Sequence, residues 1–293
     1  MPRFDRGEVS IAYETRGPEQ GPAFVLIRGL STQLIHWPER FLDRFSEAGF
    51  RVVVFDNRDC GLSTKFDHAG VPSMGDVVRG EVAPPYRLED MALDVVGLLD
   101  TLDIDRAHAA GISLGGMIAQ HLAFGHGARF HSVASIMSTS GAPGLPAGTP
   151  EAIEALTSRP EDPDDREAVI RHSMRTQRVI ESPAFPPTED ELRSYFERGY
   201  DRCYCPDGSV RQMAAATADG SRADRLAKIA LPFLVVHGID DPLIRVACGE
   251  DTARHVPGAR LETIPGMGHD ITDANSDRVA DLLIDHARRS VRD

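Results

Sequence analysis

The sequence contains one complete Gly-x-Ser-x-Gly pentapeptide, Gly111-Ile112-Ser113-Leu114-Gly115. Two further Gly-x-Ser tripeptides, which end at Ser31 and Ser63, lack the second glycine. In such a pentapeptide the serine occupies a sharp turn between a strand and a helix, and the turn exposes its hydroxyl as a nucleophile. The pentapeptide alone is weak evidence, because at about 7% glycine a chance match occurs in roughly one chain in ten of this length.

The segments on either side of Ser113 strengthen this interpretation. A short apolar run at 107–110 predicts a strand before the serine, and residues 114–124 predict a helix rich in small side chains after it. Glycines fit the flanking positions because larger side chains would collide with the adjoining strand and helix. The helix N-terminus would then favour an oxyanion that develops beside the serine. The alternative is an ordinary N-cap serine whose glycines serve only packing.

A serine hydroxyl needs a base to remove its proton, and histidine suits this task near neutral pH. Among the eleven histidines, His269 lies in a glycine-rich loop directly after a predicted strand. Sites of open α/β folds gather at the carboxyl ends of the strands, so this loop can present an imidazole to Ser113. His121 and His126 fall on the helix after the serine and are expected to face away, and His237 is expected to be structural.

A carboxylate that orients the base should follow another strand and lie between the serine and the histidine in the chain. The segment Gly238-Ile239-Asp240-Asp241 offers two candidates. We prefer Asp241, because the turn that begins at Gly238 should direct its fourth residue toward His269. Asp240 is then expected to be solvated or structural. The resulting order of serine, aspartate and histidine differs from that of chymotrypsin-like and subtilisin-like proteases.

The elements that would position these residues follow a regular pattern. Short β-rich runs alternate with longer helical patterns, which predicts an α/β fold with a mainly parallel central sheet flanked by helices. The runs at 23–28 and 51–56 are continuously apolar, as is typical of strands buried on both faces. The expected strands cover 9–14, 23–28, 51–56, 107–110, 131–137, 231–237 and 259–264, and the expected core helices cover 38–48, 88–102, 114–124 and 277–288.

This alternation breaks between residues 141 and 225. The stretch opens with the Pro/Gly-rich segment GAPGLPAGTP and continues with helical patterns at 151–156, 164–180 and 189–201, without strands between them. We therefore expect an inserted helical cap at 141–225. The core domain would consist of a first part at 1–140 and a second part at 226–293.

Over nearly its whole length the chain resembles the α/β-hydrolase superfamily of serine esterases. The resemblance rests on the strand and turn that lead to Gly29, the segment DNRDCGLS at 56–63, the pentapeptide around Ser113, and the turns that carry Asp241 and His269. It implies an α/β-hydrolase fold in which these last three residues form a catalytic triad.

The resemblance also implies an oxyanion hole formed by the backbone N–H groups of Leu30 and Leu114. The family often has His-Gly where this chain has Arg28-Gly29. The arginine does not exclude activity, because the donor is a backbone N–H, but it alters the local hydrogen bonding of the turn. The segments DNRDCGLS and PGMGH are similar to those of the aclacinomycin methylesterase-like bacterial hydrolases, which implies a bulky or polyketide-type ester.

Five further side chains are expected to line the substrate pocket. Trp37 follows the oxyanion turn, Met117 and Met267 flank the catalytic segments, and Tyr195 and Tyr200 lie at partly helical spacing in the cap. For the three aromatic residues the alternative is packing in the core or between the cap and the core.

Composition limits the location and the partners. The net charge of −13 disfavours binding to nucleic acids or anionic membranes. The first twenty residues lack a signal-peptide pattern and the apolar runs are too short to span a bilayer, so the expected location is the cytoplasm. Neither a metal nor an organic cofactor is expected. The sequence is compatible with a monomer or a homo-oligomer. The scattered cysteines predict free thiols: Cys60, Cys203, Cys205 and Cys248.

Together these features favour hydrolysis of a small-molecule carboxylic ester through an acyl-enzyme on Ser113. The same triad could instead cleave a lactone, an amide or a C–C bond, or catalyse perhydrolysis, and neither fold nor triad separates these reactions. A non-catalytic ligand-binding protein that has kept the fold is a further alternative. The serine argues against dehalogenase and epoxide-hydrolase chemistry, which uses a carboxylate nucleophile on this fold.

Overall fold

The computed structural model describes residues 1–291. An eight-stranded sheet runs through it in the order β1-β2-β4-β3-β5-β6-β7-β8. β2 pairs antiparallel with β1 and with β4, and the other neighbours pair parallel, so the predicted α/β fold with a mainly parallel sheet is confirmed. The strands are β1 (Arg3–Arg6), β2 (Val9–Arg16), β3 (Ala23–Ile27), β4 (Arg51–Phe55), β5 (Ala107–Ile112), β6 (Phe130–Ile136), β7 (Phe233–Gly238) and β8 (Arg260–Ile264).

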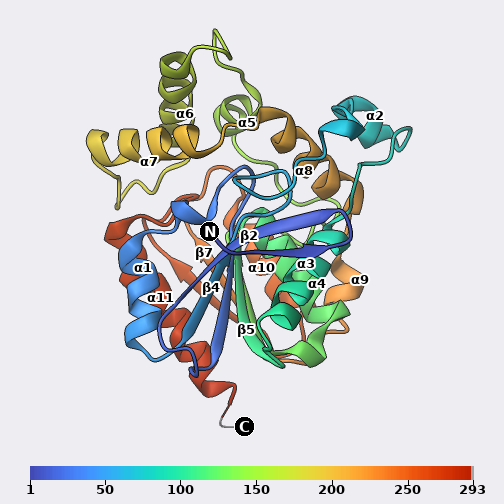
Figure 1. The fold of residues 1–293 in the computed structure, drawn as a ribbon, viewed down its shortest axis with the longest axis vertical. Coiled ribbons are helices and arrows are strands. Elements are labelled where there is room, and N and C mark those ends of the chain that lie inside the picture. Colours follow the sequence, from blue (N-terminus) through green and yellow to red (C-terminus); the bar gives the residue numbers. More distant parts are fainter. Residues whose placement is uncertain (292–293) are drawn as a thin grey trace.

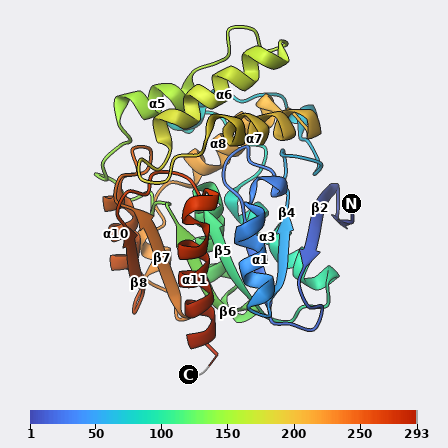
Figure 2. The same ribbon diagram turned by 90° about the vertical axis from the view of Figure 1, so that its left-hand side faces the viewer.

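Helices cover both faces of the sheet, as Figures 1 and 2 show. In β3, Phe24 and Leu26 pack with α1 and α11, whereas Val25 and Ile27 pack with α3 and α4. This alternation explains the continuous apolar run, because both sides of a central strand are buried. The helices are α1 (Glu39–Glu47), α2 (Met74–Arg79), α3 (Leu88–Thr101), α4 (Leu114–Gly125), α5 (Pro150–Thr157), α6 (Arg166–Ile180), α7 (Glu189–Arg202), α8 (Pro206–Asp219), α9 (Ala223–Leu226), α10 (Val246–His255) and α11 (Asp273–Arg289).

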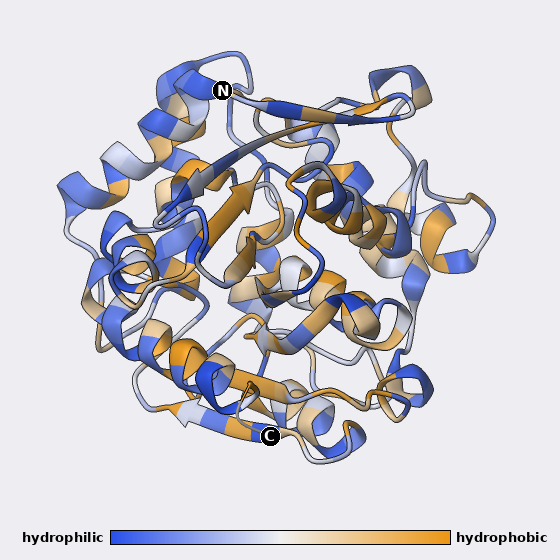
Figure 3. Cartoon of the chain, turned by 60° about the horizontal axis from the view of Figure 1, so that its bottom comes forward, coloured by the Kyte–Doolittle hydropathy of each residue, from blue (hydrophilic) through white to orange (hydrophobic). Residues whose placement is uncertain are grey.

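Apolar residues gather toward the centre of the molecule and hydrophilic residues lie around its outside (Figure 3). No helix among residues 1–291 combines the length and the apolar character needed to cross a bilayer. All four cysteines are free, as expected.

Most of the expected elements are confirmed within a few residues, but five were missed. β1 is a four-residue edge strand, and α2 and α9 have only six and four residues, so each offers too short a pattern to recognise. α8 was missed although it has 14 residues, because Arg211 and Gln212 lie on its buried face. α10 was missed because few of its residues are apolar.

The segment between β6 and β7 contains the helices α5 to α9. Figures 1 and 2 show α5, α6 and α7 beyond one end of the sheet. The chain after α6 contacts the loop that follows β8: Gly268 donates its backbone N–H to Ser182 Oγ at 2.9 Å, and His269 donates its own to the Ile180 carbonyl at 2.7 Å. The inserted helices therefore contact the loop that carries His269.

Candidate active site

Ser113 occupies the sharp turn between β5 and α4. Its φ of 57° and ψ of −117° lie in a region that non-glycine residues rarely adopt. Hydrogen bonds on both sides hold this conformation: the Ser113 N–H donates to the Ile136 carbonyl at 2.9 Å, and the Ser113 carbonyl accepts from Ser138 Oγ at 2.8 Å. The predicted strand–turn–helix arrangement is present.

The two glycines of the pentapeptide have the steric role expected of them. A Cβ on Gly111 would lie 1.9 Å from the Gly115 carbonyl oxygen, and a Cβ on Gly115 would lie 2.3 Å from the Ile27 carbonyl oxygen. Both contacts are with backbone atoms, which cannot move aside without opening the turn. The turn therefore admits only glycine at these two positions.

Ser113, His269 and Asp241 lie in one hydrogen-bonded line. His269 Nε2 is 3.0 Å from Ser113 Oγ, and His269 Nδ1 is 2.7 Å from Asp241 Oδ2. The imidazole is 7% exposed and the carboxylate is fully buried. A proton on Nδ1 donates to the carboxylate, which leaves Nε2 free to accept the serine proton. The three residues come from turns after β5, β7 and β8.

Asp240 and Asp241 differ in their contacts. Asp241 Oδ1 accepts the backbone N–H groups of Leu243 and Ile244, each at 2.9 Å, so both carboxylate oxygens are occupied. Asp240 is exposed, and its Oδ2 accepts the Gly266 N–H at 2.7 Å. Asp240 therefore braces the loop before His269 instead of touching the imidazole.

Two other histidines considered in the sequence bind mainly other groups, although His237 Nε2 also lies 3.7 Å from Asp241 Oδ2. His237 is fully buried, its Nε2 lies 2.8 Å from the Ile244 carbonyl oxygen, and burial lowers its pKa. His121 lies 3.1 Å from Asp219 on α8, on a part of α4 away from Ser113. Both contacts are structural, as the sequence analysis expected.

The first residue of α4 and the turn after β3 both adjoin the serine. Leu114 is the first residue of α4, so its N–H has no acceptor within the helix. Leu30 follows Gly29, and a Cβ on Gly29 would lie 3.2 Å from Ser113 Cβ and 3.8 Å from Ser113 Oγ. The turn after β3 is thus packed directly against the serine.

Gln212 on α8 holds this turn and was missed in the sequence analysis. Its Oε1 accepts the Ser31 N–H at 3.0 Å, and its Nε2 donates to the Arg58 carbonyl at 2.7 Å. Gln212 is completely buried. No local pattern could have revealed it, because its partners lie more than 150 residues away in the chain.

Arg28, where the sequence departs from the family pattern, points into the protein and is 6% exposed. Its Nε donates to Thr32 Oγ1 at 3.2 Å, and its Nη2 donates to the Tyr195 hydroxyl at 3.1 Å. Thr32 Oγ1 in turn donates to the Gly29 carbonyl at 3.0 Å. The arginine thus connects the turn after β3 to α7.

Three of the five expected pocket residues serve packing instead. Trp37 is 2% exposed and stacks on Phe41 with ring centroids 5.1 Å apart, inside the cluster that α1 and α11 cover. Met267 is completely buried in the same cluster. Tyr200 packs against the small cluster between α6 and α7 and stacks on Tyr204 at 5.0 Å. For Trp37 and Tyr200 this agrees with the packing alternative.

Tyr195 and Met117 have other surroundings. Tyr195 stacks on His36, with ring centroids 4.2 Å apart, and its hydroxyl contacts Arg28. Met117 is half-buried on α4, one turn after Ser113, and packs against the cluster that α3 and α4 cover.

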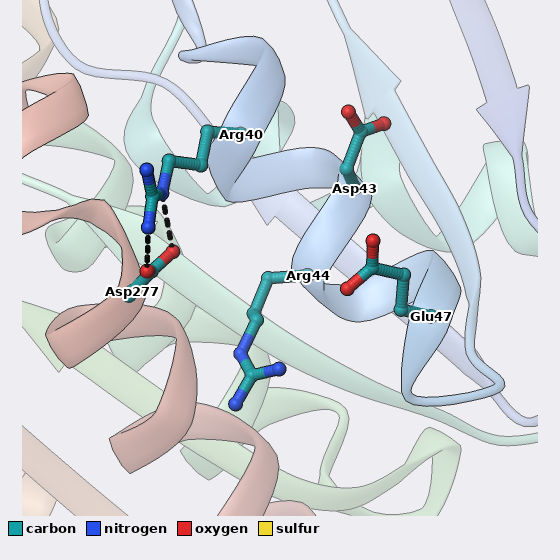
Figure 4. A pocket seen from close by; sticks show the side chains of 5 residues that line it. All are labelled: Arg40, Asp43, Arg44, Glu47 and Asp277. Carbon is teal, nitrogen blue, oxygen red and sulfur yellow. Dashed lines mark hydrogen bonds and ion pairs between the residues drawn. The ribbon is translucent and has the colours of Figure 1, made fainter.

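A surface groove between α1 and α11 is a different kind of feature (Figure 4). Arg40 and Asp277 face each other across it and form an ion pair, so its charges are largely matched. None of the triad residues lines it. Its lining residues are Arg40, Asp43, Arg44, Glu47 and Asp277. Within residues 1–291, no group of three or more His, Cys, Asp or Glu side chains is placed to hold a metal ion.

Comparisons with known proteins agree with this geometry. The sequence profile of the alpha/beta hydrolase fold family matches residues 22–275. The chain is 24% identical to rhodomycin D methylesterase DauP of Streptomyces sp. (strain C5), over 97% of this chain and 96% of that protein. It is 26% identical to 3-oxoadipate enol-lactonase 2 of Acinetobacter baylyi, over 88% of this chain and 85% of that protein.

The fold is shared with solved structures. The crystal structure of the enol-lactonase from Burkholderia xenovorans LB400 superposes with a TM-score of 0.72 at 22% identity and covers 100% of both chains. The profile match spans most of the sequence and includes the turns that carry Ser113, Asp241 and His269. The chain therefore belongs to the alpha/beta hydrolase fold family.

Proposed function

We propose that this chain is a serine hydrolase that cleaves small-molecule carboxylic esters through an acyl-enzyme. One observation carries the proposal: a continuous hydrogen-bonded line from Ser113 Oγ through His269 to the buried Asp241. Such a line activates a hydroxyl that is otherwise a poor nucleophile. The strained backbone of Ser113 supports the same role, because strain of this kind is typical of functional sites.

Each residue has one task in the reaction. His269 Nε2 takes the proton from Ser113 Oγ as the oxygen attacks the ester carbonyl, and Asp241 stabilises the imidazolium that forms. The backbone N–H groups of Leu30 and Leu114 donate to the oxyanion. His269 then gives its proton to the leaving alcohol, and the acyl-enzyme remains. In the second half a water molecule loses a proton to His269 and attacks the acyl carbon. His269 then returns this proton to Ser113 Oγ as the bond from the acyl carbon to the serine breaks, which releases the acid and the free serine.

The relatives support an ester as the substrate. One relative is named a methylesterase and another an enol-lactonase, and both names denote cleavage of an acyl–oxygen bond. We propose a bulky ester as the natural substrate. The similarity to a methylesterase, which extends over nearly the whole chain, favours this class.

We also propose that residues 141–225 form a cap over a core made of 1–140 and 226–293. Two buried contacts support this division. Gln212 on α8 binds the turn after β3, and Arg211 on the same helix pairs with the buried Asp59 at 2.8 Å. Ion pairs this deeply buried favour one fixed arrangement of the two parts. Free thiols, two of them only half-buried, support a reducing compartment, and we propose that the enzyme acts in the cytoplasm.

Replacement of the nucleophile tests the function. Ser113→Ala should lower turnover of 4-nitrophenyl acetate by about ten-thousand-fold or more and abolish labelling by a fluorophosphonate probe. Ser290→Ala, at the end of α11 and far from the triad, is the matched control and should keep both signals. Near-normal turnover in Ser113→Ala would refute the assignment. A panel of methyl, aryl and bulky esters beside lactones and amides would then identify the preferred class.

A further inference from the structure

The guanidinium of Arg28 is a buried positive charge. The residue is 6% exposed, yet among residues 1–291 its guanidinium makes no ion pair with a carboxylate. Arginine is rarely buried to this degree unless it is paired, because removing its charge from water is costly. The other deeply buried arginines follow this rule: Arg58 pairs with Asp94 at 2.7 Å and Arg211 pairs with Asp59 at 2.8 Å.

The neighbours of Arg28 supply only part of what a guanidinium needs. Thr32 and Tyr195 accept from Nε and Nη2, and the guanidinium carbon lies 4.7 Å from the ring centroid of Trp37. Nη1 is buried and has no hydrogen-bond partner within the described part of the chain. Both acceptors are neutral hydroxyls and engage two of the five N–H donors, so the remaining donors, among them both on Nη1, and the positive charge stay unmatched.

The carboxylates on neighbouring segments are already engaged. Asp56 accepts the N–H groups of Leu34 and Leu62 and pairs with Arg202 at 2.8 Å. Asp270, next to His269, accepts from the backbone N–H and the hydroxyl of Ser182. Neither carboxylate lies within 4.0 Å of Arg28.

Several arginine charges act on His36, which stacks on Tyr195 beside Arg28. Burial, together with the positive charges of Arg28, Arg198 and Arg202, lowers the pKa of His36 to about 3. His36 is therefore neutral at pH 7. This local field contrasts with the net charge of −13 of the whole chain, which would repel an anion elsewhere.

The unmatched cation lies on the turn that faces the nucleophile. Arg28 directly precedes Gly29, whose Cβ position is 3.2 Å from Ser113 Cβ. From this geometry we propose that Arg28 Nη1 binds an anionic group of the substrate, so that the enzyme prefers esters that carry a carboxylate a few bonds from the scissile carbonyl. This inference rests on the proposed esterase function. It names the substrate class as anionic esters, such as half-esters of dicarboxylic acids.

Binding can be measured without turnover, because Trp37 is the single tryptophan of the chain and the Arg28 guanidinium lies over its ring. Adipate titrated into Ser113→Ala protein should change the Trp37 fluorescence in a saturable way, whereas the neutral diamide adipamide should not. Adding Arg28→Met should abolish the response. Arg44→Met removes the same charge from an exposed position on α1 and should keep it. An equal response to adipate and adipamide, or none to either, would overturn the proposal.

The kinetic test compares two esters of equal shape. 4-Nitrophenyl hydrogen adipate carries a carboxylate, and its methyl-capped analogue is neutral. The ratio of their kcat/KM values should favour the anion in the wild type and fall by about 10- to 100-fold in Arg28→Met, the range expected for one charge-assisted hydrogen bond. Arg28→Lys retains the positive charge and should keep much of the preference for the anionic ester. Arg44→Met should leave the ratio of the two kcat/KM values unchanged. A ratio unchanged in Arg28→Met contradicts the inference.

The two tests separate the two proposals. If the wild type hydrolyses neither ester but adipate alters Trp37 fluorescence through Arg28, the esterase function fails and the anion site stands. If the neutral ester is cleaved and adipate has no effect, the function stands and the anion site fails. Should Arg28→Met not fold, the wild-type response to adipate against adipamide still decides the question.

Discussion

The backbone N–H of Ser31 donates to Gln212 Oε1 at 3.0 Å and thereby ties the turn after β3 to α8. This turn carries Leu30, the proposed second oxyanion donor. The amide of Gln212 is held in place because its Nε2 donates to the Arg58 carbonyl at 2.7 Å. One buried side chain thus holds the turn that carries the proposed oxyanion donor.

Gln212→Leu should therefore lower kcat with little change in KM. The turn after β3 loses its anchor, so the Leu30 N–H is no longer held where the oxyanion forms, and a fall of about 10- to 100-fold is expected. Steady-state kinetics with 4-nitrophenyl acetate provide the measurement. Asp207→Asn, an exposed change in the first turn of α8, serves as the control. A rise in KM alone would mean that Gln212 contributes to substrate binding instead of holding the oxyanion turn.

Asp241→Asn should reduce kcat by about a thousandfold or more while the fold is retained. An amide at this position no longer stabilises the imidazolium and permits the wrong tautomer of His269. Asp240→Asn is the adjacent control, because Asp240 is exposed and contacts only the loop at Gly266. It should change kcat less than about fivefold, since the loss of one exposed contact costs under about 1 kcal/mol. A larger loss in Asp240→Asn would reverse the assignment of the two carboxylates.

Gly29→Ala should impair catalysis more than stability. The added Cβ would lie 3.2 Å from both Ser113 Cβ and the Ile112 carbonyl oxygen, so the turn must shift by a few tenths of an ångström. The proposed oxyanion donors would then miss their position, and kcat should fall about tenfold or more. Gly125→Ala is the matched control, because nothing lies within 4 Å of its Cβ position at the end of α4. That change should leave kcat intact, and equal losses in both variants would contradict the argument.

Asp270→Asn should change how stability depends on pH. Burial raises the pKa of Asp270 to about 6, against hydrogen bonds from Ser182 that lower it. The unfolded carboxyl has a pKa of about 3.9, so between about pH 4 and pH 6 the folded protein holds a proton that the unfolded chain has lost. The free energy of unfolding attributable to Asp270 therefore decreases as the pH rises through this window, by about 3 kcal/mol.

Urea unfolding of the wild type and of Asp270→Asn at several pH values measures this effect. Relative to the wild type, the variant should gain about 3 kcal/mol between pH 4 and pH 6.5, because asparagine has no proton to lose. Asp273→Asn, an exposed position at the start of α11, gives the same change in net charge as a reference. Parallel stability curves for Asp270→Asn and the wild type would rule out this role for Asp270.

Local patterns predicted most of the core. The buried strands β3 and β4 were recognisable because both of their faces contact apolar helices, which leaves a continuous apolar run in the sequence. α1 was recognisable because its apolar side chains repeat at helical spacing. α8 was not, since its buried face carries Arg211 and Gln212, and polar side chains can be buried only where distant partners accept them.

The sequence by itself determined the family, the α/β architecture and the candidate nucleophile and base. Ser113 and His269 could be chosen because each lies in a short motif directly after a predicted strand, and parallel strands bring such turns to one edge of the sheet. The glycine spacing around Ser113 was also recognisable as a local motif. The reason for Gly111 lies within the turn, because a Cβ there would meet the Gly115 carbonyl, whereas a Cβ on Gly115 would meet the Ile27 carbonyl of β3.

Only the tertiary structure decided how these residues and their neighbours meet. It brings His269 within 3.0 Å of Ser113, gives Asp241 and Asp240 different partners, and buries Trp37 in the core. It also buries Arg28 where no carboxylate of residues 1–291 pairs with it. Such contacts join residues far apart in the chain, and their distances depend on how whole layers pack, which no local pattern of residues encodes.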